Sequence, residues 1–271
     1  MTDEKIIKNP HSEEIAKRFG KLVDVMYTLR SEKGCSWDRS QTLKDLKQYL
    51  LEECYELLQA IDLEDDQSMR EELGDLLFEV VFLSQMMQEQ NKFTLNEVLD
   101  HVLNKMIGRH PHVFGDVKAE TPEKALASWE SMKISEVNAR TGQKRKLLEG
   151  VPIDLPALLQ TFLISTKVAR NGFDWETEAD VWKKFEEELK EFSEAQSQES
   201  KEEEFGDLLF TLVNVARKNQ INPEDALRAA NRKFRNRFDR LEDHAREQNK
   251  EVKELSASEL DSIWEQVKKE S

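Results

Sequence analysis

The stretch LLEECYELLQAIDLEDDQSMREELGDLLFEVVF, residues 50–82, decides the fold, because it has helical periodicity on both sides of a polar turn. The apolar positions of its second half recur in steps of three and four: Leu73, Leu76, Leu77, Val80 and Val81. The polar sequence LEDDQS separates the two halves. The stretch therefore predicts a hairpin of two helices, over residues 41–63 and 69–90.

The same stretch carries two acidic pairs, Glu53 with Glu56 and Glu72 with Asp75. Each pair is spaced i, i+3, which places both carboxylates on one face of a helix. The pairs are also symmetric about the turn, so antiparallel helices bring all four carboxylates to one height. Four such groups raise one another's pKa or hold cations between them. We interpret them as a metal site; the alternative is that they are solvated helix faces.

A second copy of the pattern follows in residues 183–213, KKFEEELKEFSEAQSQESKEEEFGDLLFTLV. It predicts helices near 178–195 and 201–218 and carries its own acidic set: Glu188, Glu191, Glu204 and Asp207. Three further blocks match in the same order: GCSWD with GFDWE, NKMIGRHPHVF with NRKFRNRF, and SWESMK with SIWEQVK. Matched blocks in one order indicate an internal duplication.

The composition is that of an all-α protein, since Gly (9) and Pro (6) are scarce in 271 residues and 35% are charged. We expect an N-terminal helical repeat over 1–137 and a C-terminal repeat over 157–271. The segment between them, 138–156, contains two Gly and two Pro and is expected to be a linker.

The net charge of -15 disfavours binding to nucleic acid polymers and to anionic membranes. A small anion could still bind through metal ions held by the acidic residues. The chain has neither a membrane-spanning stretch nor an N-terminal signal pattern, and its two cysteines form no disulfide framework. A cytoplasmic location is therefore expected.

The candidate ligands are all carboxylate oxygens, which favours Mg²⁺, or Mn²⁺ as a substitute, over zinc. A di-iron helical bundle requires Glu-x-x-His, and neither repeat contains it. Gly74 and Gly206, in ELGD and EFGD, suggest close helix approach or room for a ligand.

As a set, EECYE with EELGDLLF, EEELKE with EEEFGDLLF, and RHPHVF resemble the MazG nucleoside triphosphate pyrophosphohydrolases in their tandem-domain form. The resemblance covers nearly the whole chain. It implies four-helix-type modules that are completed as helical bundles by dimerisation, so a homodimer is expected. It also implies an enzyme that hydrolyses an NTP or dNTP between the α and β phosphates with Mg²⁺, as nucleotide-pool house-cleaning with broad base tolerance.

By the same resemblance, the second repeat's four acidic residues hold metal, and Glu187 and Glu203 accept a proton from water or hold a further metal. The first repeat's Glu53, Glu56, Glu72 and Asp75 form a second candidate metal set. Candidate substrate-binding residues are those that could meet phosphate or stack on a base: Lys184, Lys201, Lys233, Arg237 and Trp264, with Lys105, Arg109 and Trp129 at matching positions of the first repeat.

The second repeat has more cations near its acidic set, so we expect the main active site there. For Trp264, packing in the core is the alternative to base stacking, and Phe173 and Trp175 of GFDW are expected to anchor a helix in the core. Two rival functions remain: a non-catalytic helical scaffold, or the same fold acting on a phosphoribosyl nucleotide or dUTP.

Overall fold

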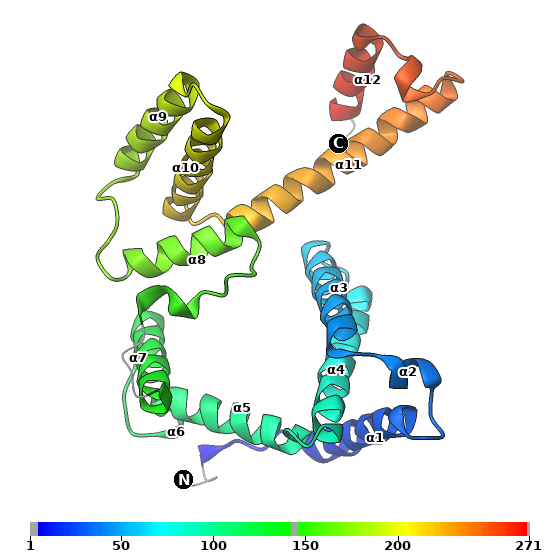
Figure 1. Ribbon diagram of the computed structural model, residues 1–271, viewed down its shortest axis with the longest axis vertical. Helices are drawn as coiled ribbons and strands as arrows, with labels where there is room; N and C mark the ends of the chain where they lie inside the picture. The colour runs from blue at the N-terminus through cyan, green and yellow to red at the C-terminus, as the bar shows by residue number, and fades with distance from the viewer. Residues whose placement is uncertain (1–4, 142–145, 270–271) are drawn as a thin grey trace. The chain divides into compact units, whose positions relative to one another are not determined.

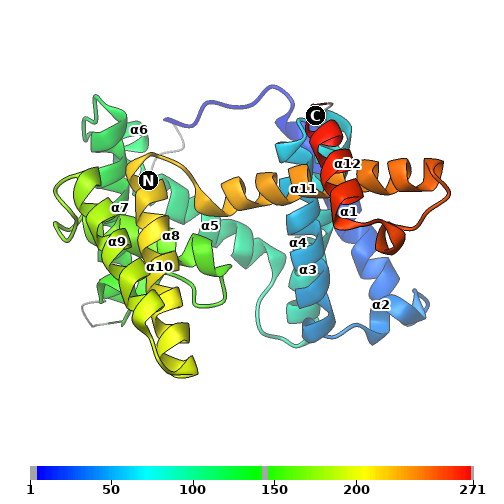
Figure 2. The same ribbon diagram turned by 90° about the horizontal axis from the view of Figure 1, so that it is seen from above.

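The computed structural model describes residues 5–141 and 146–269, and within these ranges the chain is helical with no strand (Figures 1 and 2). The prediction of an all-α fold is confirmed. The chain divides into two compact units, Met1–Gln143 and Lys144–Ser271. None of the described helices is both long and apolar enough to cross a membrane.

The first unit contains α1 (Ser12–Arg30), α2 (Ser36–Ser40), α3 (Leu43–Asp62), α4 (Asp66–Glu89), α5 (Leu95–Arg109), α6 (Pro111–Phe114) and α7 (Pro122–Thr141). The second contains the 3-10 turn η2 (Leu147–Gly150), α8 (Ala157–Ala169), α9 (Glu178–Glu194), α10 (Gln198–Lys218), α11 (Pro223–Glu247), the 3-10 turn η3 (Val252–Glu254) and α12 (Ala257–Lys269).

Both predicted hairpins are present, and corresponding caps start their helices. Thr42 and Thr177 form capping boxes at the starts of α3 and α9, with Asp45 and Asp180 respectively. Asp65 and Ser197 cap α4 and α10 in the same register. Each cap satisfies backbone N–H groups that the helix leaves unpaired, so the capping residues fix where each helix begins.

The packing order is the same in both units. α3 packs on α4 as α9 packs on α10, and α1 lies on α4 as α8 lies on α10 (Figures 1 and 2). Further along, α5 contacts α4 and α7, while α11 contacts α10 and α12. The repeated blocks of sequence therefore correspond to repeated pairs of packed helices.

The first unit has a core centred on Phe82 and Val81 of α4, Met26 of α1 and Leu46 of α3, each nearly inaccessible to solvent. In the second unit, Val181, Leu208 and Val213 are buried between helices. A further cluster joins the end of α11 to α12 through Leu241, Ala245, Ile263 and Val267 with Leu255. The first two sets include residues of the hairpins that carry the acidic residues, whereas the third joins only α11 and α12.

The expectation for the GFDW loop is wrong at Phe173, which is 80% exposed. Gly172 turns the chain with φ of +85°, and the neighbouring Asp174 accepts hydrogen bonds from Arg217 and Lys218 of α10. These bonds hold the pKa of Asp174 down to about 2. The loop is thus tied to the hairpin by an ion pair, while Trp175 is half-buried.

The segment expected to be a linker begins later than predicted, because α7 continues through residue 141. No Gly or Pro interrupts the helix before Gly142. Residues 142–145 lie outside the described residues. Beyond them the chain forms η2 and then reaches α8 through Pro152 and Pro156.

Candidate active site

Three carboxylates of the second unit lie together between α9 and α10. Oxygens of Glu188, Glu191 and Glu204 all lie within 4.8 Å of one another, and Glu188 is buried, with only 5% of its surface exposed. Asp207 falls outside this group. It lies one turn beyond Glu204 on α10, displaced by about 4.5 Å along the axis and about 60° around it. Its charge still contributes to raising the pKa of Glu204, after burial and the charges of Glu191 and Glu188.

The first unit holds a matching group of Glu53, Glu56 and Glu72, with the same 4.8 Å limit between oxygens. Asp75 again lies outside the group. Burial, followed by the charges of Asp75, Glu56 and Glu72, raises the pKa of Glu53 to about 7. Burial also raises the pKa of Glu72, with the charge of Glu56 as the next cause. The carboxylates are therefore close enough to oppose one another's ionisation.

These oxygens fit a small divalent cation. Mg²⁺ takes oxygen ligands at 2.0–2.1 Å, so opposite ligands are about 4.2 Å apart. The 4.8 Å span of each group exceeds this by an amount that small side-chain rotations remove. Neither group contains a His or Cys ligand, so the donor chemistry suits Mg²⁺ or Mn²⁺ better than zinc.

The raised pKa of Glu53 predicts how the stability of the first unit depends on pH. The folded protein retains the proton up to a pKa of about 7, whereas the unfolded chain loses it near 4.5. Without metal, stability should therefore fall as pH rises between these values. Thermal unfolding in a chelator should show the fall in the wild type, and Glu53→Gln should reduce it. An equal slope in the variant would contradict this assignment.

The ammonium group of Lys184 lies beside the second acidic group. Its Nζ lies 2.8 Å from Glu187 Oε1 and 2.7 Å from Glu188 Oε1. Hydrogen bonds to these two carboxylates raise the pKa of Lys184. Glu187 and Glu203 are exposed, as is Lys201. Lys201 lies in the first turn of α10, three residues before Glu204.

The remaining predicted substrate residues of the second unit form a separate group on α11 and α12. The Trp264 ring lies 5.4 Å from that of Phe234, which stacks on Phe238 at 6.2 Å. Arg237 Nε is buried and has no hydrogen-bond partner among the described residues. Lys233 is exposed on the same helix. Figure 1 shows α11 leading away from the α9–α10 hairpin.

In the first unit, Arg109 and Trp129 are brought together, and Arg109 is already paired with a carboxylate. Arg109 lies over the Trp129 ring at 5.3 Å and donates to Glu136 at 2.7 Å. Lys133 lies 5.2 Å from the same ring centre, and Lys105 is half-buried on α5. Because Glu136 satisfies Arg109, this repeat has less positive charge to offer a triphosphate.

Sequence reasoning missed Glu79, one turn beyond Asp75 on α4. It is buried, and its Oε2 has no hydrogen-bond partner among the described residues. Burial raises its pKa, and the charge of Asp75 adds to the shift. The available signal was a charged residue inside the apolar run LLFEVVF, where the second repeat has Thr211.

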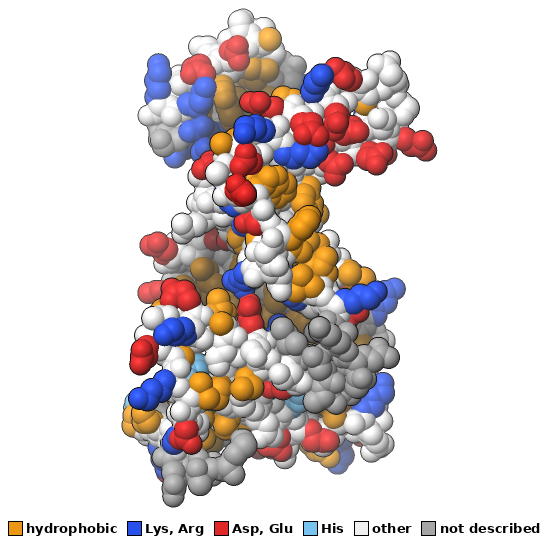
Figure 3. Space-filling view, turned by 90° about the vertical axis from the view of Figure 1, so that its left-hand side faces the viewer, with side chains coloured by type: hydrophobic (Ala, Val, Ile, Leu, Met, Phe, Trp, Pro, Cys, Tyr) orange, Lys and Arg blue, Asp and Glu red, His pale blue; other side chains and the backbone are white. Residues whose placement is uncertain are grey.

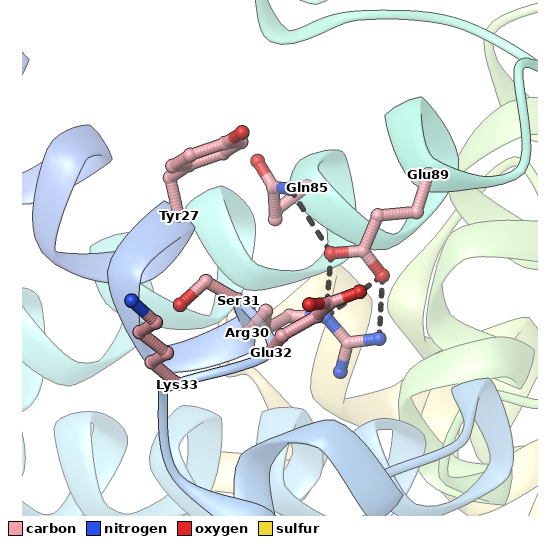
Figure 4. A pocket seen from close by; sticks show the side chains of 7 residues that line it. All are labelled: Tyr27, Arg30, Ser31, Glu32, Lys33, Gln85 and Glu89. Atoms are coloured by element: carbon pink, nitrogen blue, oxygen red, sulfur yellow. Dashed lines mark hydrogen bonds and ion pairs between the residues drawn. The ribbon is translucent and has the colours of Figure 1, made fainter.

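A pocket at the ends of α1 and α4 is not part of either acidic group (Figure 4). The Arg30 guanidinium in it donates to both carboxylate oxygens of Glu89 and to the Asp38 carbonyl. Glu89 lies 17 residues beyond Glu72 on one helix, a distance of about 25 Å. The ion pair holds α1 against α4.

Two family descriptions match the chain. Residues 41–114 match the MazG nucleotide pyrophosphohydrolase domain, and residues 155–234 match phosphoribosyl-ATP pyrophosphohydrolase. A Thermotoga maritima protein named nucleoside triphosphate pyrophosphohydrolase/pyrophosphatase MazG is 44% identical over 250 residues, covering 92% of this chain and 95% of its own. The chain belongs to the MazG family. This confirms the resemblance drawn from the motifs and the expectation of an enzyme.

Other relatives of this MazG chain cover a similar span. A nucleoside triphosphate pyrophosphohydrolase of Escherichia coli (strain K12) is 41% identical over 256 residues, covering 92% of this chain and 97% of its own. An uncharacterized protein of Bacillus subtilis (strain 168), YabN, is 44% identical over 254 residues, with 92% of this chain and 51% of YabN covered. These matches extend across both repeats.

Proposed function

We propose that the chain hydrolyses nucleoside triphosphates, ribo or deoxy, to a nucleoside monophosphate and pyrophosphate, with Mg²⁺ and mainly in the second repeat. The observation that carries the proposal is the group of Glu188, Glu191 and Glu204, in which a buried carboxylate lies within 4.8 Å of two others. The names of relatives that align with both repeats support a triphosphate substrate.

In this proposal the three grouped carboxylates, with Asp207 nearby, hold the metal. A divalent ion bound there neutralises phosphate charge and lowers the pKa of a bound water. Glu203, exposed beside Glu204, accepts the proton of the attacking water. Glu187, which pairs with Lys184, is the second candidate for this role.

The distribution of cations supports the second repeat as the main site. Lys184 and Lys201 flank its acidic group, whereas Tyr49 and Met69 occupy the matching positions of the first repeat. On α11, in the separate group described above, Arg237 has a buried Nε without a partner among the described residues, while Arg109 of the first repeat is bound by Glu136. A triphosphate carries several negative charges, so lysines beside the acidic group favour its binding.

Trp264 packs against the α11–α12 cluster and is half-buried, and we propose that its exposed part stacks on the base with broad tolerance, since an aromatic face can stack on any base. Such an enzyme would suit house-cleaning of the nucleotide pool, and we expect it to act in the cytoplasm, where that pool lies. A phosphoribosyl nucleotide is the second candidate substrate, because residues 155–234 match the phosphoribosyl-ATP pyrophosphohydrolase family.

Pyrophosphate release from a panel of NTPs, dNTPs, dUTP and phosphoribosyl-ATP, with Mg²⁺ or with chelator, tests the proposal. We expect release from several NTPs and dNTPs in Mg²⁺ and none in chelator. Turnover of phosphoribosyl-ATP alone, or of dUTP alone, would mean that this compound is the substrate instead. No release from any compound would favour the non-catalytic scaffold.

We also propose that the chain forms a homodimer, because matching stripes of α4 and α10 are uncovered. Leu73, Leu77 and Val80 are 55%, 43% and 42% exposed, and the corresponding Phe205, Leu209 and Leu212 are 51%, 41% and 45% exposed. On the one face of the molecule that Figure 3 draws, hydrophobic side chains gather in a patch, although the view does not single out either stripe. A second copy presenting the same stripe would bury both and complete a helical bundle.

Leu209→Asp is expected to dissociate this dimer, because it would bury a charge in an apolar interface. Light scattering after size-exclusion chromatography should give the monomer mass for the variant and twice that mass for the wild type. Ile153→Asp, at a position 84% exposed and outside the stripes, serves as the control and should remain dimeric. A monomeric wild type would refute the dimer.

A further inference from the structure

Lys184 makes the most specific contact in the second acidic group. Its ammonium lies 2.7 Å from Glu188 and 2.8 Å from Glu187, and Glu188 is one of the three carboxylates whose oxygens cluster. The Glu188 side chain is only 6% exposed, whereas that of Lys184 is 36% exposed. A buried carboxylate is thus neutralised by a cation that retains access to solvent.

Stabilisation of α9 is a poor explanation of the Lys184–Glu188 pair. A Lys four residues before a Glu is the weaker orientation of an i, i+4 pair, because it works against the helix dipole. The first repeat also has α3 without such a cation. Its matching position is Tyr49, which packs against the hydrophobic core and lies 6.0 Å from the Trp37 ring. The same hairpin therefore forms with an aromatic residue at this position.

A lysine ammonium and a divalent cation compete for the same carboxylate charge. If the ammonium stayed within hydrogen-bond distance of Glu188 while that residue bound metal, two cations would lie a few ångströms apart and repel each other. The flexible four-carbon stem of Lys184 allows the ammonium to move away without change in the backbone. Glu187, which is exposed, cannot retain it as strongly alone.

We propose that Lys184 is a displaceable counter-ion, which neutralises Glu188 in the metal-free second repeat, is released when metal binds, and then binds a phosphate of the substrate. The inference rests on the proposed function, because it assumes a metal in this group. It gives one lysine opposite effects on the two ligands, since Lys184 weakens metal binding and strengthens nucleotide binding. The first repeat, with Tyr49, lacks this coupling.

Binding of Mn²⁺ alone, followed by electron paramagnetic resonance, tests this in a Glu53→Gln background that removes a ligand of the first group. Lys184→Met should bind Mn²⁺ about fivefold more tightly than the parent, the size of effect typical of one partly exposed ion pair. Lys184→Arg should match the parent. Lys183→Met is the matched control, because Lys183 is the adjacent lysine and pairs with Asp180 instead.

The second measurement is the KM for the best nucleotide in saturating Mg²⁺, which should rise in Lys184→Met and stay unchanged in Lys183→Met. A purely structural role would weaken the binding of both metal and nucleotide. Unchanged or weaker Mn²⁺ binding by Lys184→Met would overturn the inference while leaving the proposed hydrolysis intact. A parent chain that binds no Mn²⁺ and releases no pyrophosphate would overturn the proposed function and this role together.

Discussion

Glu188→Gln is expected to reduce Mg²⁺-dependent pyrophosphate release by at least about 100-fold. Replacing residues that merely orient metal ligands costs 10–100-fold, so loss of a ligand in the centre of the group should cost no less. Gln preserves the size and one oxygen of Glu188 but removes the charge that both metal and Lys184 require. The decrease should appear in kcat at saturating nucleotide, measured as pyrophosphate formed.

Two companion variants make this result specific. Glu186→Gln lies on the same helix at an exposed position outside the group, and it should retain wild-type activity. Glu53→Gln tests the first repeat, and we expect most activity to remain. Loss in both Glu188→Gln and Glu53→Gln would mean that the two repeats act together or that both turn over. Full activity of Glu188→Gln would exclude the second repeat as the main site.

Phe82→Ala is expected to destabilise the first unit by about 3–5 kcal/mol, the usual cost of truncating a buried Phe. Phe82 is 1% exposed and packs in the cluster with Met26, Leu46 and Val81. Its ring also lies 5.3 Å from the Arg30 guanidinium, so the truncation removes a cation–π contact as well as core volume. In chemical denaturation, the midpoint of the first unit's transition should move to a clearly lower denaturant concentration in the variant.

Phe93→Ala provides the matched control, because this residue is 40% exposed and loses far less contact area. Its effect should be small by comparison. If Phe82→Ala unfolded at the same denaturant concentration as Phe93→Ala, the result would contradict the packing of α1 and α3 on α4 described above. Pyrophosphate release below the transition should persist, since the proposed main site lies in the second unit.

The sequence by itself determined the helices, the hairpins and the residues that could bind metal. Apolar positions repeating every three or four residues require a helix, and caps such as Thr42 and Ser197 fix its start within a few residues. The spacing of Glu53 and Glu56 fixes one face of one helix, because helical geometry is local. The duplicated order of motifs was visible because a comparison of the two halves needs only the sequence.

Only the tertiary structure decided which of these side chains meet. Three carboxylates of each hairpin converge while Asp75 and Asp207 lie outside, because helix rotation and crossing angle set contacts across a hairpin. Long side chains then pair with residues of other helices that lie within their reach: Arg30 of α1 pairs with Glu89 of α4, and Arg109 of α5 pairs with Glu136 of α7, 27 residues away. Spacing along a chain fixes direction within one helix, but contact between helices depends on how their surfaces pack, which is a non-local property of the fold.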